Sequence, residues 1–273
     1  MSISTALVTG ASAGIGRELV RQLVIDRGMT VLAAARRRDR LESLAAELPE
    51  GRVVIEAGNL SDGGFRERLW DRAMEVFPGG LDLLVNNAGI GHYEAFEEED
   101  PAMLREIMEV NLIAPMDLTQ KAIRHMKARG RGQVMIVSSV LGFVGLPYSA
   151  AYSASKHAIN GLVRSLRYEL RGSGVRVWAT CPNRTESEFH RVAMGEASGA
   201  EAGRAPHAEP VDRVVRSMVR GIDGRSTFQF PGRSARWVVG VARVLPRPFD
   251  WFMDRWSPGH FRAEMERGRS GSS

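Results

Sequence analysis

Short apolar runs with strand character alternate with amphipathic helical patterns along most of this 273-residue chain. The first run covers residues 3–8 and precedes a helical pattern at 17–27, and the second covers 30–35 and precedes one at 39–48. Two neighbouring parallel strands need a crossover connection, which is usually a helix. The alternation therefore predicts an α/β fold in which helices cover both faces of a doubly wound parallel sheet.

The alternation continues to about residue 230 and predicts a single domain over 1–232. The remaining predicted strands are 52–57, 81–85, 134–137, 175–180 and 226–230. The remaining predicted helices are 61–77, a long helix after Pro101, one with Tyr152 near its start, and 210–222.

A glycine-rich turn, Thr9-Gly-Ala-Ser-Ala-Gly-Ile-Gly16, joins the first predicted strand to the first helix. Gly10, Gly14 and Gly16 permit a tight turn and a close approach of the backbone to a phosphate, which then rests on the N–H groups of the helix N-terminus. At the start of an α/β chain this pattern is typical of dinucleotide binding. An ordinary flexible turn is the alternative.

Three consecutive arginines, Arg36 to Arg38, follow the second predicted strand. In a dinucleotide-binding fold this end of the strand faces the adenosine ribose. An acidic residue there accepts a hydrogen bond from the 2′-hydroxyl, whereas a cation suits a 2′-phosphate. The arginines therefore favour NADP, with Arg36 the first candidate, Arg37 the next and Arg38 a solvated helix-cap residue.

Tyr152 and Lys156 are four residues apart in a predicted helix, so they lie on one face about a turn from each other. A phenol with its usual pKa of about 10 is a poor acid–base catalyst at neutral pH, and a nearby ammonium group lowers that pKa. Ser139 ends a predicted strand and can hold a substrate carbonyl. Taken alone, the pair is more simply interpreted as a surface tyrosine beside a solvated lysine. The other motifs determine whether the catalytic interpretation is preferred.

Small and amide residues, Asn86-Asn-Ala-Gly89, follow the fourth predicted strand, where they fit a close cofactor contact. Asn111 lies among apolar neighbours in the next helix, where an amide needs partners. Pro115 removes a backbone hydrogen bond four residues later, so a locally opened helix is predicted there. A satisfied core amide is the alternative for Asn111.

Composition narrows the class of protein. Hydrophobic residues make up 44% and charged residues 25% of the chain, and the net charge of +5 comes from scattered arginines without a basic, aromatic stripe that would predict nucleic-acid binding. The single cysteine, Cys181, and six isolated histidines favour a reducing, cytoplasmic compartment and predict no metal site. A strand begins at once, so no signal peptide is expected, and no apolar stretch is long enough to span a bilayer.

Together these motifs resemble those of the short-chain dehydrogenase/reductase family, in the subgroup with a Tyr-x-x-x-Lys pair. The resemblance runs from residue 3 to about 230, and five motifs follow the family's order and spacing. The motifs are Thr9-Gly10-x-x-x-Gly14-x-Gly16, Asn86-Asn87-Ala88-Gly89, Asn111, Ser139 and Tyr152-x-x-x-Lys156. The resemblance implies a Rossmann-type sheet with strand order 3-2-1-4-5-6-7 and chemistry by hydride transfer.

The resemblance also implies a role for each residue of the motifs. Tyr152 is the general acid for ketone reduction and the general base for alcohol oxidation, and Lys156 lowers its pKa and binds the nicotinamide ribose. Ser139 orients the substrate oxygen, and Asn111 anchors a water in a proton relay to Lys156. Asn86 contacts the adenosine ribose.

The implied cofactor is NADP(H) in preference to NAD(H), because NADP-preferring relatives carry an arginine at the position of Arg36. The chain departs from the family pattern at Ala13, which replaces a basic residue, and at Asn59, which replaces an aspartate near adenine. Asn183 replaces a glycine, and Ser187 a threonine near the nicotinamide carboxamide. The predicted cofactor residues are Gly10, Ser12, Gly14, Ile15, Gly16, Arg36, Arg37, Asn59, Leu60, Asn86, Ala88, Gly89, Tyr152, Lys156, Pro182, Asn183 and Ser187.

The substrate pocket is predicted from the loops around the Tyr152 helix. Its lining candidates are Gly91, His92, Tyr93, Leu141, Phe143, Val144, Tyr148 and Phe189. Direct substrate contacts are expected from Ser139, Tyr152, His92, Phe143, Tyr148 and Phe189. Most of these side chains are apolar, which favours a hydrophobic ketone, and residues 189–210 are interpreted as a mobile substrate lid.

Residues 233–273 form a C-terminal extension without a family pattern. On a helical wheel Trp237, Val238, Val241, Val244 and Leu245 share a face, and Arg236, Arg243 and Arg247 lie opposite. Pro246 and Pro248 then break the helix, and the run 249–256 is rich in aromatic residues. Contact of 233–256 with a membrane surface is one interpretation, and packing over the pocket or in a subunit interface is the other. Residues 268–273 are expected to be disordered.

The sequence thus predicts an NADP(H)-dependent oxidoreductase that interconverts a carbonyl and a secondary alcohol. A non-catalytic NADP-sensing or scaffold protein is one alternative, although such proteins often lose the tyrosine or lysine that this chain keeps. A sugar-nucleotide epimerase or dehydratase shares the pair but is usually longer. The resemblance further implies a homodimer or homotetramer formed through the Tyr152 helix and its neighbour.

Overall fold

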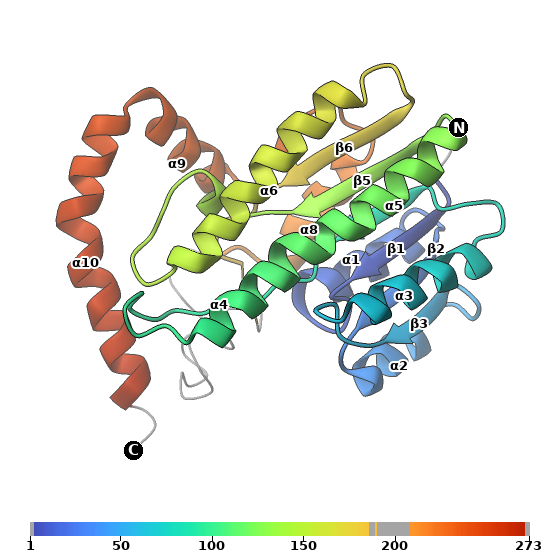
Figure 1. Ribbon diagram of the computed structural model, residues 1–273, viewed down its shortest axis with the longest axis horizontal. Coiled ribbons are helices and arrows are strands. Elements are labelled where there is room, and N and C mark those ends of the chain that lie inside the picture. The colour runs from blue at the N-terminus through green and yellow to red at the C-terminus, as the bar shows by residue number, and fades with distance from the viewer. Residues whose placement is uncertain (1–2, 186–188, 190–207, 271–273) are drawn as a thin grey trace.

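The computed structural model describes residues 3–185, 189 and 208–270, and these form a central parallel sheet with the strand order β3-β2-β1-β4-β5-β6-β7 (Figure 1). This order confirms the predicted doubly wound topology. The strands are β1 Thr5–Thr9, β2 Thr30–Ala35, β3 Val53–Ala57, β4 Leu83–Asn86, β5 Gly132–Val137, β6 Val175–Thr180 and β7 Phe228–Gln229.

Helices cover both faces of this sheet, as the alternation predicted. One face carries α1 (Gly14–Ile25), α2 (Arg38–Ala46) and α8 (Val211–Gly221), and the other carries α3 (Gly63–Val76), α5 (Ala114–Ala128) and α6 (Ala150–Glu169). Side chains alternate across a strand, so Ala6 and Val8 of β1 join one apolar layer and Leu7 joins the other. Coverage of both faces explains why the strands are nearly continuous apolar runs.

The helix after Pro101 opens at Asn111, which confirms the prediction from the asparagine and the proline. α4 (Pro101–Met108) is followed by a π-helical turn, η1 (Glu109–Ile113), and then by α5. Pro115 lies in the first turn of α5 and has no backbone N–H to donate. Such π turns interrupt α-helices mostly at functional sites.

The loops at the carboxyl end of the sheet carry two further differences from the predicted elements. A short 3-10 turn, η2 (Val140–Gly142), follows β5. The predicted lid, 189–210, lies mostly outside the described residues, but its flanks meet where the Glu209 N–H donates to the Arg184 carbonyl at 2.9 Å. The last strand is shorter than predicted, because only Phe228–Gln229 pairs with β6.

The C-terminal extension forms two helices at the end of the molecule opposite β3 and α2 (Figure 1). α9 (Arg233–Val244) stops before Leu245, and α10 (Pro246–Ser270) starts at Pro246, so the helix breaks where predicted and a new one begins. The tail prediction was wrong for 268–270, which lie in α10. Within the described ranges, no helix combines the length and hydrophobicity needed to cross a bilayer.

Candidate active site

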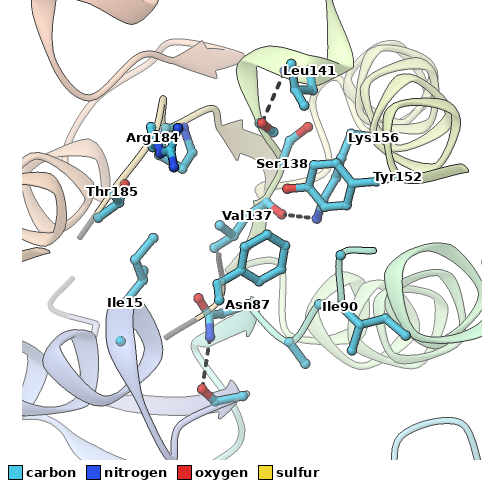
Figure 2. Close-up of a pocket in the computed structure, with 18 of the residues that line it drawn as sticks. Ile15, Asn87, Ile90, Val137, Ser138, Leu141, Tyr152, Lys156, Arg184 and Thr185 are labelled. Atoms are coloured by element: carbon cyan, nitrogen blue, oxygen red, sulfur yellow. Dashed lines mark hydrogen bonds between the residues drawn. The ribbon is translucent and has the colours of Figure 1, made fainter. Parts of the chain in front are cut away.

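A cavity of about 790 Å³ lies at the carboxyl ends of the parallel strands, where α/β sheets bind their ligands. Its lining comes from the turn after β1, the loops after β2 to β6, the start of α6, and the helices α9 and α10. Arg184 and Thr185 lie across this cavity from Tyr152 and Lys156 (Figure 2). Segments that are far apart in the sequence therefore converge on one site.

The glycine-rich turn forms one end of the cavity, and its glycines are required by its geometry. Gly10 has a φ of +68°, and a Cβ on Gly16 would lie 2.2 Å from the Gly10 carbonyl oxygen. The N-cap residue of α1 is Ala13, which supplies no side-chain cap, and the first turn carries no acidic residue. The first N–H groups of α1 thus remain available to an anion.

Arg36 and Arg37 both line the cavity, and Arg38 does not. The Arg36 side chain is 62% exposed and lies 3.9 Å from Glu106, whereas a guanidinium N–H of Arg37 donates to the Ser12 hydroxyl at 3.3 Å. Arg38 lies 3.9 Å from Glu42 in α2. The two arginines beside the turn place positive charge where the sequence predicted a phosphate.

The two asparagines at the end of β4 place their side chains differently, and the structure does not support the role predicted for Asn86. The Asn86 amide is buried and donates to the Thr119 hydroxyl at 3.0 Å, so it lies outside the cavity and cannot reach a ribose there. Asn87 lines the cavity instead, and its amide donates to the Thr9 carbonyl at 2.9 Å and to the Gly10 carbonyl at 3.2 Å. Asn87 therefore fixes the glycine turn against the end of β4.

Tyr152, Lys156 and Ser139 form the opposite, buried end of the cavity. The Lys156 ammonium group donates to the Val137 carbonyl at 3.0 Å and lies 5.5 Å from the centroid of the Tyr152 ring (Figure 2). The Ser139 hydroxyl oxygen accepts from the Leu141 N–H at 3.1 Å. The start of α6 and the end of β5 thus hold these three polar groups together.

Burial shifts both titratable groups toward their neutral forms. Burial raises the pKa of the Tyr152 phenol far above its usual value, and a hydrogen bond with Ser139 opposes this only in part. Burial lowers the pKa of Lys156 to about 8. The prediction that Lys156 brings down the pKa of Tyr152 is not met in this structure, because burial outweighs every other influence on the phenol.

Asn111 lies in the π turn beside this end of the cavity. Its amide donates to the Ile90 carbonyl at 2.8 Å and to the Ser155 hydroxyl at 3.2 Å, and its oxygen accepts from the Ile90 N–H at 2.8 Å. A Cβ on Gly89 would lie 3.2 Å from the Asn111 oxygen and 3.6 Å from the Lys156 nitrogen. Asn111 and Lys156 thus approach the same glycine, and the water relay between them stays a prediction.

Arg66, which the sequence did not single out, connects the π turn to the loop after β3. Its buried guanidinium donates to Glu109 at 2.8 Å and to Asp117 at 2.7 Å, on the two sides of the turn. It also donates to the Leu60 carbonyl at 2.7 Å, and Leu60 lines the cavity. One side chain therefore ties the opened helix to the predicted adenine end of the site.

The predicted substrate residues divide into two groups. Tyr148 and Phe189 line the cavity, and the Phe189 ring lies 5.5 Å from that of Tyr152. His92 is outside the lining, and its Nδ1 lies 2.7 Å from Glu99. Phe143 is also outside, because its ring packs 5.2 Å from that of Phe228 at the sheet edge. The remaining lining candidates, Gly91, Tyr93, Leu141 and Val144, all lie on the cavity.

Packing over the pocket was one of the two interpretations of the C-terminal extension, and α9 and α10 do line the cavity, but the sequence did not predict which of their residues would do so. α9 and α10 supply apolar lining residues, namely Val238, Phe249, Phe252, Met253 and Trp256. The predicted cofactor residues Ser12, Gly14, Ile15, Asn59, Leu60, Ala88, Gly89, Pro182 and Asn183 line the cavity as well. Ser187 lies outside the described residues. The aromatic run after Pro248 was a signal for this wall, but it carried no family pattern.

Comparison with known proteins identifies the family. Residues 4–195 match the short chain dehydrogenase family, so the chain belongs to it. It is 36% identical over 256 residues to an uncharacterized oxidoreductase of Myxococcus xanthus, covering 91% of this chain and 95% of the relative. It is 33% identical over 205 residues to a 3beta-hydroxysteroid dehydrogenase 2 of Eggerthella lenta, covering 74% of this chain and 77% of the relative.

Solved structures with the same fold have been obtained with different bound nucleotides. A short-chain dehydrogenase from Sphingobium yanoikuyae in complex with NADPH is 28% identical, with a TM-score of 0.76 over 89% of this chain and 94% of that one. One from Burkholderia phymatum in complex with NAD is 22% identical, with a TM-score of 0.79 over 89% and 94%, and shows the fold alone. The family match therefore supports an oxidoreductase that binds a nicotinamide nucleotide, without fixing which one.

Proposed function

We propose that this protein is an NADP(H)-dependent oxidoreductase that interconverts a carbonyl and a secondary alcohol on a hydrophobic small molecule. One observation carries the proposal. A single cavity has the glycine turn and two arginines at one end, and Tyr152, Lys156 and Ser139 at the other. A dinucleotide that reached from one end to the other would bring its nicotinamide to the phenol.

The residues of the cavity fit such a cofactor. Glycine at positions 10 and 16 allows the close-packed turn, because a Cβ there would collide with neighbouring protein atoms, and the first turn of α1 has neither a side-chain cap nor an acidic residue. Arg36 and Arg37 would hold a 2′-phosphate, and the Lys156 ammonium group would hold the nicotinamide ribose. When bound, the cofactor supplies or accepts the hydride. Asn59 and Leu60 would contact adenine.

Tyr152 would hold or move the proton at the substrate oxygen. Burial raises the pKa of this phenol, so at neutral pH it carries its proton and can donate it as the carbonyl oxygen gains charge. Ser139 would hold the same oxygen, because its hydroxyl lies beside Tyr152 in the lining. In the reverse direction, the phenolate of Tyr152 would accept the proton of the alcohol.

The preference for NADP(H) rests on the positive charge after β2. The Arg36 guanidinium lies 3.9 Å from Glu106 and its side chain is 62% exposed, so it would be able to bind a phosphate. Arg37 is held beside the glycine turn by its hydrogen bond to Ser12. Ala13, at the N-cap of α1, adds no positive charge, and Arg17 in the first turn of α1 is paired with Glu47. The preference for NADP(H) over NAD(H) would therefore come from the arginines after β2 alone.

The substrate would be a bulky, apolar ketone or its alcohol. The part of the cavity beyond Tyr152 is lined by Val144, Leu146, Tyr148 and Phe189 and by the apolar wall of α9 and α10. Apolar pockets of this kind recognise apolar ligands and fix them by few polar contacts. A relative of 33% identity is named a hydroxysteroid dehydrogenase, which agrees with this substrate class.

Further features belong to the same proposal. Residues 1–232 would be the catalytic domain, and 189–210 a lid over its cavity. We propose a homodimer or homotetramer through α6 and α5, and a cytoplasmic protein with peripheral membrane contact. Ser139, Tyr152 and Lys156 line one cavity, which counts against a pure NADP sensor. A sugar-nucleotide epimerase or dehydratase usually has a larger C-terminal substrate domain, whereas the described residues after β7 form only two helices.

Titration of purified protein with NADPH and NADH, followed by nicotinamide absorbance against a panel of apolar ketones and aldehydes, tests the proposal. Tighter NADPH binding and oxidation by a panel member are expected. NADPH binding without turnover would point to a sensor instead. No binding of either nucleotide would refute the assignment of the cavity.

A further inference from the structure

The segment from Trp237 to Trp256 exposes an unusual amount of apolar surface. Of the large hydrophobic side chains exposed in the described part of the chain, most belong to these 20 residues. They are Trp237, Val241, Val244, Leu245, Trp251, Phe252 and Trp256, and together they are called the α9–α10 surface here. Large exposed apolar patches mark interaction sites.

The orientation of α9 explains part of this surface. Ala235 and Val239 pack inward against the cavity wall and are buried, whereas Trp237 is 71% and Val244 77% exposed. The apolar side found on the helical wheel is therefore mostly the outward side, with only Val238 partly buried. α9 is apolar on both sides, and its larger side chains face away from the protein.

The net charge of residues 233–256 indicates which kind of partner can bind the α9–α10 surface. Residues 233–256 contain five arginines and two aspartates, which gives 5 − 2 = +3. Arg236 and Arg247 are exposed, and Arg255 lies over the Trp251 ring at 4.2 Å. Two copies of this segment would bring like charges together. The Arg243 guanidinium lies over the Phe143 ring at 4.9 Å. An anionic lipid surface would therefore meet the exposed Arg236, Arg247 and Arg255 together with the aromatic side chains.

The α9–α10 surface is continuous with the cavity. Phe252 and Trp256 are 50% and 45% exposed, their rings stack at 5.8 Å, and both also line the cavity. Phe249 and Met253 on the same helix continue the apolar lining inward. An apolar path therefore leads from the outside of α10 toward Tyr152.

We propose that the α9–α10 surface docks on an anionic lipid surface, and that an apolar ketone dissolved in that lipid enters the cavity past Phe252 and Trp256. Figure 1 shows both helices at the margin of the molecule, where they can reach a flat surface. The docking part deepens the peripheral membrane contact proposed above and does not depend on the catalytic assignment, whereas the entry part rests on that assignment.

Vesicle flotation of the full chain tests the docking part. Vesicles of phosphatidylcholine alone are compared with vesicles that also contain phosphatidylglycerol, with wild type and with the double variant Trp237→Ser/Trp251→Ser. Neither tryptophan lines the cavity. The matched control is Ile25→Ser/Tyr168→Ser, two side chains that are 61% and 71% exposed elsewhere. Circular dichroism confirms that each variant is folded.

Wild type and the control are expected to float with the anionic vesicles, and the tryptophan variant to lose about tenfold in affinity or more. The variant Arg236→Gln/Arg247→Gln should lose affinity for anionic vesicles, whereas Arg213→Gln/Arg225→Gln, which removes the same charge elsewhere, should lose less. Equal flotation of wild type and the tryptophan variant would overturn the docking part. Dimerisation of vesicle-free wild type that the tryptophan variant abolishes would assign the surface to a second copy and overturn it as well.

Turnover separates the entry part from the proposed function. The tryptophan variant should reduce a short, water-soluble ketone at the wild-type rate and a vesicle-dissolved ketone at least about fivefold more slowly, because only the second needs docking. Equal slowing of both would overturn the entry part. Flotation with no turnover of any ketone by wild type would leave docking in place and count against the proposed function.

Discussion

The two ends of the cavity are built on opposite principles. At the glycine turn, polar groups are fixed by the backbone and by side chains such as Asn87, which bonds to the Thr9 and Gly10 carbonyls. At the α9–α10 wall, the lining is apolar, partly exposed and carried by two helices at the margin of the molecule. Directional hydrogen bonds define one ligand closely, whereas apolar surface accepts a class of ligands. The comparison assigns the chemistry to the first end and the choice of substrate to the second.

The largest effect on turnover is expected at Tyr152, which lies between the polar cofactor side and the apolar wall of the cavity. Tyr152→Phe removes the phenolic proton donor but keeps the ring and its contact with Phe189. Turnover should fall by about 10³-fold, while the Kd for NADPH changes little. The matched control is Tyr168→Phe, which changes an exposed tyrosine on the same helix. Near-normal kcat in Tyr152→Phe would refute the tyrosine as acid–base group.

Arg66 tests how far the polar end depends on buried hydrogen bonds. Arg66→Ala leaves Glu109, Asp117 and the Leu60 carbonyl without their shared donor. The free energy of unfolding should fall by about 2–3 kcal/mol, and NADPH binding should weaken because the Leu60 loop is released. Denaturant unfolding and nucleotide titration measure both effects.

Arg66→Lys keeps the charge and should restore part of the stability, although an ammonium group cannot reach three acceptors in the same fork geometry. Arg68→Ala, at a side chain that is 67% exposed, serves as the control. Loss of stability in Arg66→Ala without any change in NADPH affinity would show that Arg66 supports the fold alone.

Burial of Lys156 at the end of the cavity predicts a lowered pKa for its side chain, which can be measured by titration. The sequence contains only three lysines, Lys121, Lys127 and Lys156, so their side chains can be resolved by NMR. Lys156 should titrate near pH 8 in the cofactor-free protein, because burial lowers its pKa from the usual 10.5 to about 8. A Lys156 signal that titrates together with the other two lysines would contradict the burial argument.

The same shift has a consequence for stability. The folded pKa is lowered, so between about pH 8 and 10.5 the unfolded chain binds more protons than the folded one. Burial of the charged ammonium group therefore lowers the free energy of unfolding in full below about pH 8, and this penalty is lost as the pH rises toward 10.5, so the free energy of unfolding rises with pH in this window. Replacement by Met should remove that pH dependence.

A smaller effect is expected for cofactor choice. Arg36→Ala should reduce the preference for NADPH over NADH by about tenfold, the size of one charge-assisted hydrogen bond. Arg38→Ala removes a neighbouring arginine that does not line the cavity and should leave the ratio unchanged. Equal loss in both variants would mean that general positive charge, not Arg36, sets the preference.

Sequence reasoning succeeded where a local pattern determines the structure. The alternation of apolar runs predicted the parallel sheet, and the pair Asn111 and Pro115 predicted the opened helix that appears as η1. The glycine turn follows from glycines whose Cβ atoms would collide with the backbone. These features depend on residues that are close in the chain.

Sequence reasoning failed where contacts between distant segments determine the position of a side chain. Asn86 and Asn87 look alike in the sequence, and only their position at the end of β4 sends one toward Thr119 and the other to the cavity. Arg66 was missed because its partners are 43 and 51 residues away. Packing of the C-terminal extension over the pocket was left as one of two interpretations, and its lining residues were not predicted, because a helix after Pro246 can turn in several directions.

The most direct test of the central claim follows the hydride itself. Wild type and Tyr152→Phe are incubated with NADPH that carries deuterium at the transferable position and with an apolar ketone, and the alcohol is analysed by mass spectrometry. The account predicts one deuterium on the carbinol carbon with wild type and almost no product with the variant. Alcohol without deuterium, or equal product from both proteins, would contradict it.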